Sequence, residues 1–178
     1  HQGFPFAIRN ADVFPEANTL QRAKIAWESV HNPQSYQAIH EFLRTHQVDI
    51  GHVHNWFPLL SPGIYAAHKD LGIPVVQTLH NYRLGCANGA FRRNGADCRD
   101  CLTGSRNNAL LHRCYKGSLC GSFAWKRLID HGWKDGIFTE DVDAYIAPSQ
   151  EVAQAHLQMG IPKEKIHILP NACNDLLE

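Results

Sequence analysis

One stretch of the chain, residues 49–81, most constrains the fold. It combines an apolar strand at 49–54, a helix at about 61–71 that Gly72 closes, and a second apolar strand at 73–79. A helix that connects two strands in this way brings the second strand back parallel to the first. We therefore predict an α/β fold, a Rossmann-like parallel sheet with helices on both faces.

Both strands of this unit end in a polar His-Asn pair, His54-Asn55 and His80-Asn81. The carboxyl ends of parallel strands meet at one edge of the sheet, where open α/β sheets bind their ligands. We therefore expect the two pairs to form a site at this edge. Two structural alternatives remain open: His54 and Asn55 cap the helix near Ser61, and Asn81 stabilises its turn through its own backbone.

The rest of the chain contains further strands and helices of the same kind. Apolar runs predict strands at 4–8, 143–147 and 166–169. Helical spacing predicts helices at 19–30, from Pro33 or Ser35 to Leu43, from Ser122 onward, and at 149–159, where Ser149 is the expected N-cap. Since Rossmann sheets place their first strand centrally, we expect a gap between the strands at 4–8 and 49–54.

An irregular, cysteine-rich insertion at about 82–121 interrupts this pattern. We predict that it binds a structural zinc ion, because four thiolates fill a tetrahedral zinc site and leave no open position for catalysis. Cys120 and His112 are reserve ligands, and free thiols or disulfides are the alternatives. The predicted ligands follow the pattern Cys-x11-Cys-x2-Cys-x12-Cys: Cys86, Cys98, Cys101 and Cys114.

Composition excludes several classes of protein. The 178-residue chain has 17 Lys and Arg residues against 17 Asp and Glu residues, and it shows no block of like charge. This balance argues against nucleic acid as a partner, because duplex binders carry a basic face or stripe. No apolar run approaches the roughly 20 residues of a membrane span, and the first residues do not resemble a signal peptide. We therefore expect a cytoplasmic protein.

Several motifs, taken together and in order, carry a family resemblance. They are His52–Asn55 with Phe57–Pro62, Thr78–Leu84, Cys98-x-x-Cys101-Leu102, Arg113–Ser118, Ile146–Ser149 and Leu169–Asn171. In this order they resemble the N-terminal domain of glycosyltransferase family 4, over nearly the whole chain from Trp27 onward. The resemblance implies a GT-B architecture, in which two Rossmann-like domains face a cleft.

The same resemblance implies a function and a set of site residues. The N-terminal domain of this family holds the acceptor, the C-terminal domain holds the nucleotide sugar, and transfer retains the anomeric configuration without a catalytic metal. His80 matches the active-site histidine of the family, and His54, Asn55, Asn81 and Ser149 are the expected substrate-binding residues. The expected acceptor is a glycan or glycolipid of surface polysaccharide synthesis, with peripheral contact at the inner membrane face.

The expected domain organisation follows from the same comparison. Residues 1–171 form the N-terminal domain without its first strand, and 172–178 begin a linker to an absent C-terminal domain that holds the nucleotide sugar. We expect this piece alone to be inactive. A different class remains as the alternative, a zinc-stabilised Rossmann-like binding module without catalysis. A following domain with paired glutamates would favour the enzyme, and a stop codon after Glu178 would favour the module.

Overall fold

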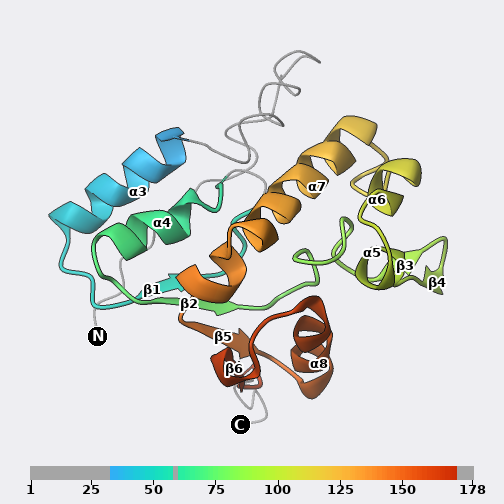
Figure 1. Ribbon diagram of the computed structural model, residues 1–178. Helices are drawn as coiled ribbons and strands as arrows, with labels where there is room; N and C mark the ends of the chain where they lie inside the picture. Colours follow the sequence, from blue (N-terminus) through green and yellow to red (C-terminus); the bar gives the residue numbers. More distant parts are fainter. Residues whose placement is uncertain (1–32, 58–59, 172–178) are drawn as a thin grey trace, which may run out of the picture.

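The computed structural model describes residues 33–57 and 60–171, and its centre is a four-stranded parallel sheet (Figure 1). The strands lie in the order β1-β2-β5-β6, and each neighbouring pair is parallel. Their bounds are β1 (Gly51–Val53), β2 (Val75–Thr78), β5 (Ala144–Ala147) and β6 (Ile166–Ile168). The predicted α/β class is therefore confirmed. Four predicted features lie outside the described residues: the strand at 4–8, the gap between it and the strand at 49–54, the helix at 19–30 and the linker at 172–178.

Four longer helices pack around this sheet. They are α3 (Pro33–Thr45), α4 (Gly63–Asp70), α7 (Leu119–Lys134) and α8 (Gln150–Met159), with short π- and 3₁₀-helical turns at η1 (Ile137–Asp141) and η2 (Lys163–Lys165). Helices α3 and α4 pack on each other near β1 and β2, and α8 packs against β5 and β6 (Figure 1). Among the described residues, no helix combines the length and apolar character needed to cross a membrane.

The predicted helix boundaries have a local cause in the structure. Gly72 and Gly160 have φ angles of +67° and +110°, a region that glycine enters without steric cost, and they follow α4 and α8. At the other end of α8, Ser149 Oγ accepts a hydrogen bond from Val152 N at 3.3 Å. Ser149 is therefore the N-cap that the sequence predicts.

The apolar core lies between the sheet and its helices. Its largest fully buried side chains are Trp125, Tyr65, Tyr145 and Phe138. Close packing also explains Gly51 on β1, because a Cβ atom there would lie 2.3 Å from Nε2 of the buried His68 on α4. The start of β1 is therefore tightly packed against α4.

The insertion between β2 and α7 contains only short elements. They are a two-stranded antiparallel hairpin, β3 (Arg92–Arg93) and β4 (Ala96–Asp97), and two four-residue helices, α5 (Asp100–Thr103) and α6 (Asn108–Leu111). Helix α7 starts before the predicted Ser122, because Ser118 Oγ accepts a hydrogen bond from Gly121 N at 3.0 Å and caps it. The expected irregular segment is therefore shorter and more structured than its lack of periodicity indicates.

Candidate functional site

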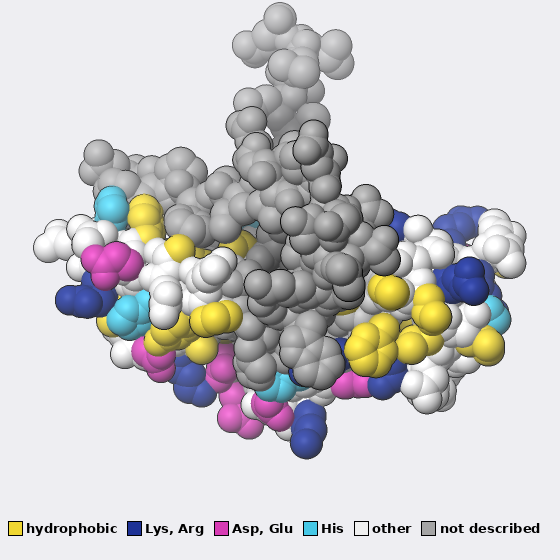
Figure 2. Space-filling model, turned by 90° about the horizontal axis from the view of Figure 1, so that it is seen from above, with side chains coloured by type: hydrophobic (Ala, Val, Ile, Leu, Met, Phe, Trp, Pro, Cys, Tyr) yellow, Lys and Arg dark blue, Asp and Glu magenta, His cyan; other side chains and the backbone are white. Residues whose placement is uncertain are grey.

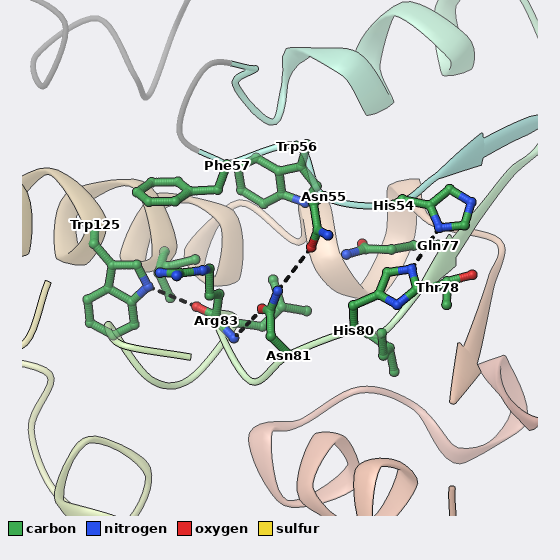
Figure 3. Close-up of a pocket in the computed structure, with 13 residues that line it drawn as sticks. His54, Asn55, Trp56, Phe57, Gln77, Thr78, His80, Asn81, Arg83 and Trp125 are labelled. Atoms are coloured by element: carbon green, nitrogen blue, oxygen red, sulfur yellow. Dashed lines mark hydrogen bonds between the residues drawn. The ribbon is translucent and has the colours of Figure 1, made fainter. Parts of the chain in front are cut away.

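A pocket of about 270 Å³ opens at the carboxyl edge of β1 and β2 (Figure 3). Side chains from the end of β1, from β2 and the loop that follows it, and from α7 line it. The polar and aromatic ones are His54, Asn55, Trp56, Phe57, Gln77, Thr78, His80, Asn81, Arg83 and Trp125. The edge that the strand pattern indicates is therefore a real depression in the protein.

The two His-Asn pairs contact each other, residue by residue, across this edge. His54 Nδ1 lies 2.7 Å from His80 Nε2, and Asn81 Nδ2 donates a hydrogen bond to Asn55 Oδ1 at 3.0 Å. The predicted convergence of the pairs is therefore confirmed. Helix α4 begins instead after Pro62 and has no side-chain cap, so the capping alternative for His54 and Asn55 is wrong.

Asn81 also makes the turn contact that the sequence left open. Its Oδ1 accepts a hydrogen bond from Arg83 N at 3.0 Å, two residues along the chain. The same side chain therefore fixes the loop after β2 through its oxygen and contacts Asn55 through its nitrogen. Asn81 holds the two strand ends in a fixed relation to the pocket.

A third histidine, His52, lies beside the polar end of the pocket without lining it. His52 lies two residues before His54 and so shares its strand face, with ring centroids 4.3 Å apart. His52 Nε2 is also 2.7 Å from Thr78 Oγ1. Partial burial, and then the proximity of His52 and His80, lower the pKa of His54. His54 is therefore neutral at neutral pH and can accept a hydrogen bond from the ring of His80.

The opposite end of the pocket is aromatic and cationic, as Figure 3 shows for Phe57, Arg83 and Trp125. The Arg83 guanidinium lies 5.9 Å from the ring centroid of Phe57 and 5.5 Å from that of Tyr115. Its Nη1 donates to the Ala87 carbonyl at 2.9 Å, and Trp125 Nε1 donates to the Arg83 carbonyl at 2.8 Å. These contacts fix a positive charge beside an apolar wall.

The charges that line the pocket indicate its chemistry. Arg83 is a cation, and no Asp or Glu occurs among the described residues that line the pocket. Glycoside hydrolases generally use a pair of carboxylates, one on each side of the scissile bond. The pocket has imidazoles, amides and a guanidinium instead, which suit hydroxyl groups and anionic phosphate.

One predicted site residue, Ser149, lies outside this pocket, and one residue that lines it, Trp56, is mostly buried. Ser149 caps α8 and is not among the lining residues. Trp56 is 5% exposed and packs edge-on against Tyr65, so it belongs mainly to the core. Sequence reasoning missed Gln77 and Thr78 as site residues, although both belong to the strand predicted at 73–79. It also missed Arg83 and Trp125.

The four predicted zinc ligands gather around a second, smaller cavity in the insertion. Burial, and then the neighbouring Cys86, Cys114 and Cys98, raise the pKa of the Cys101 thiol to about 11. As the side chains stand, no group of three or more His, Cys, Asp or Glu residues in the described part of the chain has the arrangement of a metal site. The sequence therefore predicted the gathering of these thiols, whereas the zinc ion stays a prediction.

The fold and the pocket define an α/β domain with a polar pocket at the carboxyl edge of a parallel sheet. The family model described as Glycosyltransferase Family 4 matches residues 10–175, and the chain belongs to this family. The family acts with a nucleotide-sugar donor and an acceptor, so the chain is a glycosyltransferase domain. Comparisons with curated proteins and with solved structures give no match.

Proposed function

We propose that this domain is the acceptor-side half of a retaining GT-B glycosyltransferase of the hexosyltransferase type. It places a hydroxyl group of a glycan or glycolipid acceptor at the pocket, while a C-terminal domain joined through 172–178 presents the nucleotide sugar. Family membership and the position of the pocket at the carboxyl edge of the sheet support this proposal.

The hydrogen-bonded pair of His54 and His80 carries the mechanistic part of the proposal. A neutral His54 that accepts at Nδ1 holds the proton of His80 at Nε2, and this arrangement leaves His80 Nδ1 for the substrate. In glycosyl transfer, charge develops on the anomeric carbon and on the departing phosphate. The acceptor nitrogen Nδ1 of His80, held in advance at the reacting sugar, stabilises the positive charge on the anomeric carbon without reorganising during the reaction.

The other pocket residues have roles in binding. Asn55 and Asn81 offer amide groups to sugar hydroxyls, and Arg83 offers a guanidinium to a phosphate of the nucleotide sugar or of a phosphorylated acceptor. The partly buried face of Phe57 gives the apolar contact that a sugar ring requires. Ser149, at the same edge of the sheet, contacts the substrate only if the second domain extends the site toward α8.

The proposed reaction uses the nucleotide sugar as co-substrate and no catalytic metal. We place it in surface polysaccharide synthesis in the cytoplasm, with peripheral contact at the inner membrane face. Nucleic acid is not a partner in this proposal. Because the groups that bind the nucleotide belong to the other domain, we expect the 178-residue chain to transfer no sugar by itself. Measurable transfer by this chain alone would contradict the division of roles.

The decisive experiment replaces His80 with alanine in the protein that contains both domains. His80→Ala should lower kcat/KM by roughly 10²-fold or more, since one charge-stabilising group in the transition state is lost. The matched control is His167→Ala, because His167 is an exposed histidine on β6 that does not line the pocket. Equal kinetics for both variants would show that His80 is structural.

A further inference from the structure

The larger part of the insertion, residues 92–120, keeps a defined fold with little apolar core of its own. In residues 92–120, Ala109 is the one buried side chain. The helices α5 and α6 have four residues each and the strands β3 and β4 have two each, and elements so short are not stable by themselves in water. Partial burial of Leu102 and Tyr115 against the core contributes, but a further interaction is needed to hold such short elements together.

Four cysteines from separate parts of the insertion meet at one point. Backbone hydrogen bonds fix three of them: Cys86 N donates to the Tyr82 carbonyl at 2.8 Å, Cys98 N to the Phe91 carbonyl at 2.7 Å, and Cys114 N to the Ala109 carbonyl at 3.0 Å. Cys101 lies on α5, three residues after Cys98. Residues up to 28 positions apart are thus brought to the same place.

The meeting point is a cavity of about 10 Å³, close to the room that one water molecule or small ion needs. All four cysteines line it, together with Asn88 and Asn108, whereas no Asp or Glu does so in the described structure. The cavity shares no lining residue with the pocket at the sheet edge. Its role is therefore separate from the transfer site.

The cavity also has a positive charge of the kind that a thiolate cluster needs. A divalent ion with four thiolates is a doubly negative centre, so nearby cations favour it. Arg93 lines the cavity, and its Nη1 lies 2.7 Å from the Asp100 carboxylate, beside Cys101 in sequence. This ion pair fixes the guanidinium next to the thiols.

We propose that Cys86, Cys98, Cys101 and Cys114 bind one structural zinc ion that holds the insertion together. Binding releases the four thiol protons to solvent, forms four zinc–sulfur bonds and involves no oxidation or reduction. The side chains must turn inward for this, since Cys86 Sγ now donates a hydrogen bond to Asn88 Oδ1 at 3.0 Å. With all four positions filled by sulfur, the ion has a structural role.

The first test measures metal in the full chain, purified with reductant and without chelator. About one zinc ion per chain is expected, together with protection of four of the six cysteines from a thiol reagent until the protein unfolds. Any of three results would overturn the proposal. They are the absence of zinc with all six thiols reactive, a disulfide between any of the four cysteines under these conditions, and iron in place of zinc.

The second test assigns the ligands by cobalt substitution. Cobalt should give the charge-transfer and d–d absorption bands of a tetrahedral thiolate site in the wild type and in Cys120→Ser, because Cys120 is exposed and does not line the cavity. The Cys98→Ser/Cys101→Ser variant should lose these bands and lower the zinc content by roughly tenfold or more. Bands that persist in the double variant, or that disappear in Cys120→Ser, would contradict the assignment.

Discussion

The sheet edge and the insertion lie next to each other in the sequence but are held together in different ways. The loop after β2 is supported by fully buried side chains such as Trp125 and Leu128, and Trp125 Nε1 also donates to the Arg83 carbonyl at the pocket. The segment 92–120 has one buried residue and depends on ion pairs, short hydrogen-bonded turns and a cluster of thiols. Apolar burial positions the first region, whereas polar and sulfur contacts position the second.

This difference indicates why the candidate transfer site lies where it does. The histidines must keep their relative position to within a fraction of an ångström if one is to orient the other. Strand ends on a packed sheet meet that requirement, whereas a four-residue helix on the surface does not. The insertion is therefore less suited than the sheet edge to hold the reacting groups.

The largest effect that separates the two regions is expected from a pair of leucine substitutions. Leu128 on α7 is 0% exposed and Leu111 on α6 is 75% exposed. Leu128→Ala should lower the free energy of unfolding by about 2–5 kcal/mol, because it removes buried methyl groups and leaves a cavity. Leu111→Ala should change it by less than about 0.5 kcal/mol. Urea unfolding followed by fluorescence measures both.

Equal destabilisation by the two leucine variants would contradict the contrast between the regions. It would mean that Leu111 is covered in solution, by another copy of the chain or by residues outside the described part. Repeating the measurement at several protein concentrations separates these two cases, because only association makes the midpoint depend on concentration.

Much of the fold could be predicted because local chemistry marks its boundaries. Gly72 and Gly160 follow helices at positions that require a positive φ angle, and Ser149 caps α8. The elements of the insertion could not be predicted, since two-residue strands and four-residue helices are too short to show a period. Their signal was the cysteine spacing, which predicts convergence but not which backbone contacts achieve it.

The candidate site was predictable in part for a similar reason. The connectivity of a parallel βαβ unit places the carboxyl ends of its two strands, and with them His54 and His80, at one edge of the sheet, whatever the details of side-chain packing. The contact of Trp125 with Arg83 joins residues 42 positions apart, and it depends on how α7 crosses the loop after β2. Ser149 shares the edge in sequence terms, but its hydroxyl is used by the first turn of α8. The roles of Trp125 and Ser149 thus depend on side-chain contacts that the sequence pattern does not show.

A smaller effect is expected from His54, which we propose to act through His80 as a positioning residue. His54→Phe keeps an aromatic ring next to His52 but removes the nitrogen that lies 2.7 Å from His80 Nε2. In the protein with both domains, kcat should fall by roughly tenfold with little change in KM. His54→Asn should restore part of the loss, because an amide oxygen can replace Nδ1 as acceptor. A raised KM with unchanged kcat would instead indicate direct substrate binding.

The smallest effect concerns the junction of the two regions, where Tyr82 stacks on Phe91 of the insertion and on the buried His156 of α8. Burial lowers the pKa of His156 from its ordinary value of 6.5, against the weaker opposing influence of its hydrogen bond to the Val152 carbonyl. Protonation therefore favours the unfolded chain. Above pH 6.5, the ordinary pKa that His156 has in the unfolded chain, the imidazole is neutral in both states and the protein keeps its full stability. As the pH falls from 6.5 toward the lower pKa of the folded protein, the unfolded chain takes up a proton and stability is lost.

His156→Phe tests this because it keeps a ring for the stack with Tyr82 and removes the titrating group. Free energies of unfolding should be measured for both proteins at about pH 7.5 and about pH 5.5, on either side of the ordinary histidine pKa. The wild type should lose more stability between these two values than the variant does, because only the wild type must protonate a buried imidazole on unfolding. Parallel pH profiles would show that His156 is no more shielded than the exposed histidines, and that the junction is open to water.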